Sequence, residues 1–453
     1  MAYSSKGRKP IERASKIAHG EIINNPDVVA YLQACTLPSV PEPFDIRQLI
    51  HPVSEVDVHS IRAVIAIDGG FTETYVREEF PSASLTFFTF GPLLFRLSDL
   101  RELDARRFIA PEDLAALKKL ERYTVTLPTR GIRQIGKPTL ASSIRHTIYE
   151  FFIRPRGPAE ESLIKTLVWF LFRRWEMPPD DAHAEVLAHC PNANCDAEDL
   201  RFHFDSPTVS QCPSCGQPVY LTDVFRLHER IDEEQGAGGI LTYVITLLEQ
   251  IILVHIIRTV WQMKRALLRE ILFLKDGPLG FFGLVAPLHK PMRELTKFLL
   301  YPPLSDLDGC QPYLYLAGIE KSGAFVDHAA AIERHIPPGS IMIPDNDYIY
   351  RYIVPGDPAA GVYGHNTYYG SKVFYKSSAN DMYVLTIPTG SHPDAPQPPD
   401  FPNLNVLLHL VAQLRCHMYD NALIPIALAN KLVSLSDFPS QRILTEFARG
   451  ELA

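Results

Sequence analysis

Two acidic residues each close an apolar stretch and are followed by glycine. Asp68 ends "AVIAID" before Gly69 and Gly70, and Asp276 ends "ILFLKD" before Gly277. Because Asp-Gly is common turn chemistry, one copy alone indicates only a turn after a strand. If the two strands are neighbours in one sheet, however, the carboxylates converge at the same edge. Converging carboxylates suit Mg²⁺ or Mn²⁺, and such ions stabilise the attacking and leaving oxygens in phosphodiester cleavage.

A third acidic residue lies between these two in the chain. Glu249 occupies the middle of the apolar segment "TLLEQIIL", which has the character of a buried helix. A buried charge is costly unless it is paired or bound to a metal. Glu249 is therefore either a third ligand of the same ion or the partner of an arginine such as Arg258.

Four of the seven cysteines are clustered in a short segment. Cys190 and Cys195 form a C-x4-C pair, and Cys212 and Cys215 form a C-x2-C pair sixteen residues later. Two such pairs complete a tetrahedron of thiolates, so the spacing predicts one structural Zn²⁺ with no open position for catalysis. Disulfides and chance clustering are the alternatives. Whether the module contacts DNA, a partner protein or only the rest of this chain is open.

The bulk composition places the protein among ordinary folded proteins. Its 453 residues are 46% hydrophobic and 21% charged, with a net charge of -8, which argues against a basic coat over the whole surface. The start of the chain has no apolar core typical of a secretory signal. The apolar segment 238–263 is interrupted by Glu249, His255 and Arg258, which predicts a buried helix and not a membrane span. We therefore expect a cytoplasmic protein, with Cys35, Cys310 and Cys416 reduced.

The elements that position these residues alternate between strands and helices, which predicts a mixed α/β fold with one inserted module. Strands are predicted at 63–68, 72–78, 84–95, 271–276, 313–321, 340–344, 346–354, 371–377 and 382–388. Helices are predicted at 111–122, 138–153, 159–176, 240–269, 324–335, 403–416, 421–436 and 439–450. The expected domains are a lead-in (1–60), a first part of the main domain (61–110), a helical insertion (111–182), the cysteine module (183–235) and a second part of the main domain (236–453).

Taken together, these motifs resemble the NurA nuclease family. The resemblance rests on "AIDGG", the helical Glu, "FLKDGPLG", "AGIEKSG", "GVYGHNTYYGSKVFYK" and "IPIALANKL", and covers residues 60–110 and 240–440. It implies an RNase H-like mixed sheet flanked by helices, with the four-cysteine zinc module inserted. It further implies a Mn²⁺- or Mg²⁺-dependent DNA nuclease, a homodimer, and a HerA-type hexameric ATPase as partner in DNA end processing or phage defence.

Residue by residue, the resemblance also implies a set of site residues. Asp68 and Asp276 match the metal-binding aspartates, Glu249 the helical glutamate, and Lys321 the lysine after the following strand. Lys321 could neutralise a phosphate or be a solvated strand-end residue. At Asn430 the chain departs from the family, which carries histidine there. Asparagine can bind a metal or water through its carbonyl oxygen but cannot take a proton, so Asn430 is either a weakened site residue or an ordinary helix residue.

Three functions fit these observations. The first is a metal-dependent deoxyribonuclease subunit, supported by the retained Asp68, Glu249 and Asp276. The second is a catalytically weak scaffold that docks an ATPase or DNA, which Asn430 favours. The third is a zinc-ribbon DNA-binding regulator, which explains the cysteines but not the paired Asp-Gly motifs.

Overall fold

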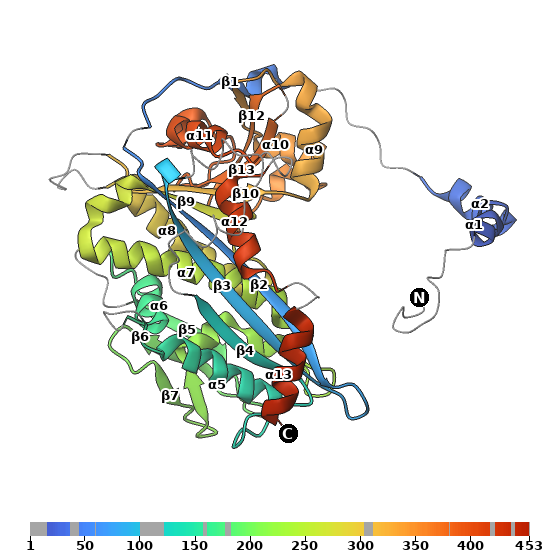
Figure 1. Ribbon diagram of the computed structural model, residues 1–453, viewed down its shortest axis with the longest axis vertical. Helices are drawn as coiled ribbons and strands as arrows, with labels where there is room; N and C mark the ends of the chain where they lie inside the picture. Colours follow the sequence, from blue (N-terminus) through green and yellow to red (C-terminus); the bar gives the residue numbers. More distant parts are fainter. Residues whose placement is uncertain are drawn as a thin grey trace. The chain divides into compact units, whose positions relative to one another are not determined.

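The computed structural model describes residues 16–36, 45–58, 60–99, 122–156, 161–176, 183–302, 311–379, 381–416, 422–435 and 440–452 (Figure 1). The chain divides into two compact units, Met1–Asp45 and Ile46–Ala453. The first unit contains α1 (Lys16–Ile23) and α2 (Pro26–Ala34). The Asn25 side chain accepts a hydrogen bond from the backbone of Asp27 and caps α2, and no residue of α2 is buried. The remaining described elements all belong to the second unit.

A nine-stranded mixed sheet forms the centre of the second unit. Its strands are β1 (Ile50–Pro52), β2 (Ala63–Arg77), β3 (Ala83–Arg96), β4 (Tyr123–Arg130), β9 (Ile271–Asp276), β10 (Tyr315–Glu320), β11 (Ser340–Met342), β12 (Ser371–Ser378) and β13 (Asp381–Ile387). Their order is β1-β11-β12-β13-β10-β9-β2-β3-β4. β9 pairs in parallel with both β2 and β10, and the other neighbours are antiparallel. The mixed α/β class predicted from the sequence is confirmed.

Helices cover both faces of this sheet. They are α5 (Leu140–Ile153), α6 (Leu163–Leu171), α7 (Leu241–Lys264), α8 (His289–Leu300), α9 (Ala324–Ile332), α10 (Asn346–Tyr352), α11 (Leu404–Gln413), α12 (Ile424–Val433) and α13 (Arg442–Leu452). Successive strand side chains point to opposite faces. Accordingly, Ile65 and Ile67 of β2 join the core that contains α7, whereas Val64 and Ala66 join the core that contains α11 and α12.

The long apolar helix α7 belongs to the core. Among the described residues, one helical stretch, Gly238–Glu270, has the length and composition to cross a membrane, but 72% of its apolar window lies inside the protein. α7 packs against β2 and β3 and also contacts α6. A helix enclosed in this way is apolar on nearly every side, which accounts for its composition. The sequence-based prediction of a core helix agrees with this finding.

The first Asp-Gly motif is not a turn. β2 runs without a break through Gly69 and Gly70, which pair with Phe90 and Thr89 of β3. The predicted strands 63–68 and 72–78 are therefore one strand. The glycines are needed for close packing, because a Cβ at Gly70 would lie 2.4 Å from the backbone oxygen of Val433 at the end of α12. Only glycine allows the helix to approach the strand so closely.

Two further elements differ from the sequence-based predictions. The predicted strand 346–354 is instead α10, whose first turn is capped by the Asp345 side chain accepting from the backbone of Tyr348. β4 lies within the predicted helical insertion 111–182 and pairs with β3 at the edge of the main sheet. The predicted helix at 111–122 falls almost wholly outside the described residues, whereas α5 and α6 lie within the two other predicted helical ranges.

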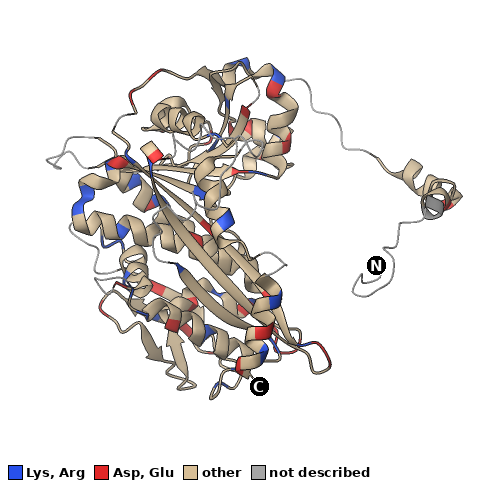
Figure 2. Cartoon of the chain, viewed as in Figure 1, with Lys and Arg blue, Asp and Glu red and all other residues tan. Residues whose placement is uncertain are grey.

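Acidic and basic residues are interspersed over the chain (Figure 2). This distribution is consistent with the net charge of -8 and with the expectation that the surface as a whole is not basic.

Candidate functional site

The parallel register brings the two Asp-Gly aspartates to the same level of the sheet. Ile67 of β2 pairs with Lys275 of β9, so that Asp68 and Asp276 are the next residues along the two neighbouring strands. Ile319 of β10 pairs with Asp276. β9 and β10 end at this level, while β2 continues. The carboxylates therefore lie at the carboxyl-terminal edge of the parallel strands.

Asp68 is a buried carboxylate with one oxygen left unpaired. Its side chain is 5% exposed. Oδ1 accepts a hydrogen bond of 2.8 Å from the backbone N–H of Gly69, whereas Oδ2 has no hydrogen-bond partner among the described residues. Burial, with the nearby charges of Asp276 and Glu249, raises the pKa of Asp68 to about 7. A cation beside Oδ2 would satisfy this oxygen.

Glu249 reaches the same point from α7, and its partner is a lysine that the sequence patterns did not single out. Lys275 Nζ lies 2.8 Å from Glu249 Oε2, and both side chains are almost fully buried. Lys275 also donates to the backbone oxygen of Asp276 at 2.7 Å. Burial raises the pKa of Glu249, and the charge of Lys275 opposes this shift. Arg258, the alternative partner considered from the sequence, instead bonds Glu161 at 2.7 Å.

Asp276 and Lys321 form the more open side of the site. Lys321 Nζ lies 2.8 Å from Asp276 Oδ2, and the side chains of Lys321 and Asp276 are 36% and 21% exposed respectively. Lys321 directly follows β10, where the resemblance placed a lysine. Because this pair is reached by solvent, breaking it costs little energy.

The donor set suits a hard divalent cation, although the lysines now hold two of the three carboxylates. Among the described residues, the four cysteines are the only group of three or more candidate ligands whose atoms all lie within 4.8 Å of one another. Asp68, Glu249 and Asp276 are therefore near one another without forming so tight a cluster. The unpaired Oδ2 of Asp68 and the solvent-reached Asp276 are the ligand atoms that such an ion would use.

Asn430 is on a helix that packs on the same strands, but no hydrogen bond joins its side chain to a described residue. It is exposed on α12, and its backbone oxygen accepts from Ser434. The end of α12 lies close to Gly70 and Gly91, and Gly91 pairs with Asp68. A role for Asn430 in the site stays a prediction.

A second Glu–Lys pair joins β10 and β12 of the same sheet and was also missed from the sequence. Lys372 of β12 bonds Glu320 at the end of β10, and both side chains are buried. The Thr386 hydroxyl lies 3.0 Å from Glu320 Oε1 and 3.2 Å from Lys372 Nζ. A lysine within a strand of apolar residues, as in "ILFLKD" or "SKVFYK", is the sequence signal that could have identified Lys275 and Lys372.

The four cysteines gather as their spacing predicted. They lie next to two hairpins, β5 (Ala184–His189) with β6 (Glu198–His203) and β7 (Val209–Gln211) with β8 (Pro218–Tyr220). Sγ atoms lie 3.9 Å apart between Cys190 and Cys215 and 3.6 Å apart between Cys195 and Cys212. A zinc tetrahedron with Zn–S bonds of about 2.3 Å has edges of about 3.8 Å. The cysteines are free thiols arranged so that they could bind a metal such as zinc.

Backbone and side-chain donors surround these sulfurs. The N–H groups of Cys215 and Ser214 lower the pKa of Cys212 to about 6, which favours the thiolate that a metal requires, whereas burial raises the pKa of Cys190. The Asn192 amide donates to the sulfurs of Cys190 and Cys215 at 3.3 and 3.8 Å.

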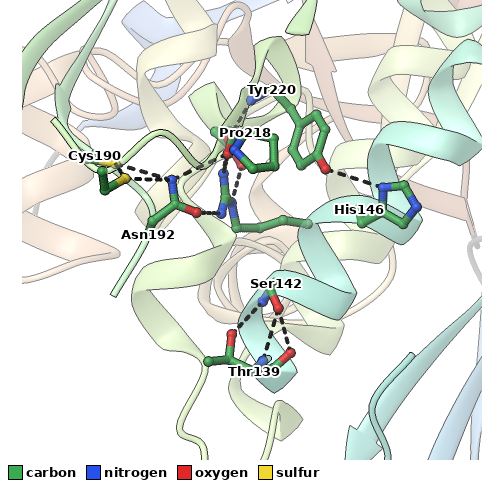
Figure 3. Close-up of polar contacts among 10 residues, drawn as sticks. Thr139, Ser142, His146, Cys190, Asn192, Pro218 and Tyr220 are labelled. Atoms are coloured by element: carbon green, nitrogen blue, oxygen red, sulfur yellow. Dashed lines mark hydrogen bonds and ion pairs between the residues drawn. The ribbon is translucent and has the colours of Figure 1, made fainter. Parts of the chain in front are cut away.

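A buried ion pair orients this amide and ties the module to α5. Figure 3 shows Asn192 in contact with Cys190. Arg145 of α5 donates to Asn192 Oδ1 at 2.7 Å. The same guanidinium donates to Asp223 Oδ1 and Oδ2 at 2.8 and 2.7 Å. The cysteine module is thereby fastened to α5 through an ion pair whose two side chains are buried.

Comparisons with known proteins add little to this geometry. No family model matches the chain, and no curated protein matches it. One similar solved structure is described as "Crystal structure of NurA", at 11% identity over 96% of this chain and 95% of that chain, with a TM-score of 0.28. The match extends over nearly the whole of both chains, but its TM-score is low. A function for this chain therefore has to be argued from the site itself.

Proposed function

We propose that this protein is a divalent-metal-dependent deoxyribonuclease with an RNase H-like sheet. The observation that carries the proposal is the unpaired, buried Oδ2 of Asp68 at the end of the parallel strands, beside Asp276 and Glu249. The antiparallel β2–β3–β4 meander continuing into parallel β9 and β10 supports the fold assignment. The motif resemblance to NurA nucleases supplies the substrate, DNA.

The site residues have distinct tasks under this proposal. Asp68 and Asp276 would hold a Mn²⁺ or Mg²⁺ ion, which supplies positive charge for the attacking and leaving oxygens of a phosphodiester. Lys275 favours the ionised form of Glu249 and fixes its position inside the core. Lys321 is placed at the open side, where it can leave Asp276 and neutralise a phosphate oxygen.

The other parts of the proposal concern assembly and place of action. A homodimer and a HerA-type hexameric ATPase partner are implied by the motif resemblance, and a cytoplasmic location is the expectation from the cysteine usage and the buried apolar helix. Zinc at the four cysteines would be structural, because four thiolates leave no open coordination position.

Replacing Asp68 with Asn tests the function directly. Asp68→Asn keeps the shape of the side chain and removes a buried charge, so the variant should fold at least as stably as the parent while losing Mn²⁺-dependent cleavage of linear DNA. Asp347→Asn, at an exposed position in α10, is the matched control and should cleave normally. Equal cleavage by Asp68→Asn and the parent protein would refute the proposal.

A catalytically weak scaffold is the second candidate, favoured by the exposed Asn430. Comparing the parent with Asn430→Ala and Asn430→His in the same assay separates the two candidates. Lower cleavage in the alanine variant, with cleavage kept or raised in the histidine variant, supports a site role. Cleavage absent from all three proteins, together with binding to an ATPase or DNA, supports the scaffold.

A further inference from the structure

The two carboxyl-terminal residues of β9 lie on opposite faces of the sheet. Successive strand residues point to opposite faces, so Lys275 shares a face with Phe273, which belongs to the core that contains α7. Asp276 shares the other face with Leu274, which belongs to the core that contains α11 and α12. The contact of Lys275 with Glu249 of α7 agrees with this assignment.

The same alternation separates Asp68 from Glu249 on β2. Asp68 shares a face with Gly70, where a Cβ would lie 2.4 Å from the backbone oxygen of Val433 at the end of α12. Gly69 points to the opposite face, and a Cβ there would lie 3.2 Å from Glu249 Oε1. The two aspartates therefore face α12, whereas Glu249 approaches the strands from the α7 face.

The Glu249 carboxylate is already engaged on its own face. Its Oε2 lies 2.8 Å from Lys275 Nζ, and the side chains of Lys275 and Glu249 are only 4% and 6% exposed. The same ammonium donates to the backbone oxygen of Asp276 at 2.7 Å. Separating such a pair leaves a buried charge without compensation, so Glu249 is held by Lys275. Asp68 Oδ2, in contrast, has no hydrogen-bond partner among the described residues.

The charges of the site match a single divalent ion. Glu249 and Lys275 neutralise each other, and the two negative charges of Asp68 and Asp276 balance one Mn²⁺ or Mg²⁺. Lys321, paired with Asp276 at the more open side, then supplies one positive charge for a phosphodiester. A second divalent ion would have to take Glu249 away from Lys275.

We propose that the candidate site is a one-ion site formed by Asp68 and Asp276 on the α12 face, and that Glu249 is not a metal ligand. Lys275 supplies the positive charge at Glu249, the position at which the motif resemblance implies a ligand of the ion. The inference rests on the proposed function for the presence of the ion and changes the number of ions and the ligands that hold them.

Calorimetric titration of the zinc-loaded protein with Mn²⁺, without DNA, tests this inference. The parent protein should bind one Mn²⁺ per chain. Glu249→Gln combined with Lys275→Met replaces the whole pair by neutral side chains, so this double variant should still bind one Mn²⁺, with an affinity within about threefold of the parent. Asp276→Asn removes a ligand and should weaken Mn²⁺ binding more than about tenfold.

A second Glu–Lys pair provides the matched control. Lys376 of β12 is buried and lies 3.6 Å from Glu333, so Glu333→Gln combined with Lys376→Met makes the same pair of substitutions away from the carboxylates. This control variant should bind one Mn²⁺ with the affinity of the parent. Thermal midpoints show whether each variant is folded, and the number of ions bound by the parent tests the inference without any substitution.

Three results would overturn the inference. They are two Mn²⁺ bound per parent chain, no Mn²⁺ bound by the parent, and binding by the folded Glu249→Gln, Lys275→Met variant that is weakened as much as that of Asp276→Asn. The proposed function can fail separately. Mn²⁺-dependent DNA cleavage by a parent protein with two bound ions would refute only the one-ion site, whereas one bound ion without cleavage would refute only the nuclease.

Discussion

Replacing Arg145 with Met should strongly destabilise the protein. Arg145 and Asp223 are 5% and 2% exposed, and the guanidinium makes two short hydrogen bonds to the carboxylate. Removing one partner of such a pair leaves the other charge buried and uncompensated, which costs about 3–5 kcal/mol of unfolding free energy. Arg145→Met retains much of the side-chain volume, so the loss reports the charge together with the hydrogen bonds of Arg145 to Asn192 and Pro218.

The same substitution should weaken zinc binding by the four cysteines. Arg145 holds Asn192, whose amide donates to the sulfurs of Cys190 and Cys215. Losing an outer hydrogen-bond partner of a metal site typically lowers metal affinity about 10–100-fold. Arg145→Met should therefore release zinc to a chelator faster than the parent protein does.

Urea unfolding of the zinc-loaded proteins measures the first effect. The double variant Arg145→Met with Asp223→Leu should lose less stability than the sum of the single variants, because it leaves no unpaired charge. Arg442→Met is the control, since its ion pair with Glu446 is largely exposed and contributes less than about 1 kcal/mol. If Arg145→Met is as stable as Arg442→Met, the reasoning about this pair is wrong.

Three further outcomes are expected. His255 is buried with Thr166 Oγ1 2.7 Å from its Nδ1, and its pKa is lowered to about 4 by burial and then by Arg258. As pH drops, the unfolded state therefore binds the extra proton first, so the free energy of unfolding should fall between about pH 6.5 and about pH 4. For this group the loss should be about 2 kcal/mol at pH 5. Urea titrations at several pH values should find this loss in the parent protein and not in His255→Gln. Gly70→Ala should cost about 1–3 kcal/mol in the same assay, because its Cβ would meet backbone that cannot yield, whereas Gly450→Ala, with open space around it, should be neutral or stabilising. Metal analysis of protein purified without added metal should find about one zinc per chain, and a value near zero would contradict the zinc assignment.

The features that the sequence predicted correctly depend on short-range patterns. Cysteine spacing predicted the sulfur cluster, because two pairs a few residues apart can close on one ion wherever the module lies. Unbroken apolar character predicted that α7 is a core helix. "ILFLKD" followed by Gly277 predicted where β9 ends, and Gly277 has the positive φ of 83° that such a turn requires.

Other features were decided by contacts between distant segments. Gly69 and Gly70 form a turn by local preference, yet β2 continues through them because β3 pairs with the strand and α12 packs closely on it. The aromatic segment 346–354 suits a strand by composition but forms α10, capped by Asp345.

The partners of the buried charges also depended on the tertiary structure. The sequence indicated that Glu249 needs a partner, but it did not identify Lys275. That pairing requires Glu249 of α7 to lie next to Lys275 of β9, which only the packing of helix and sheet decides. Lys372 of β12 likewise contacts Glu320 of β10 only because both strands pair with β13. Local chemistry determined which groups needed partners, and the packing of distant segments determined which partners they found, because a side chain's neighbours in space are set by the whole fold.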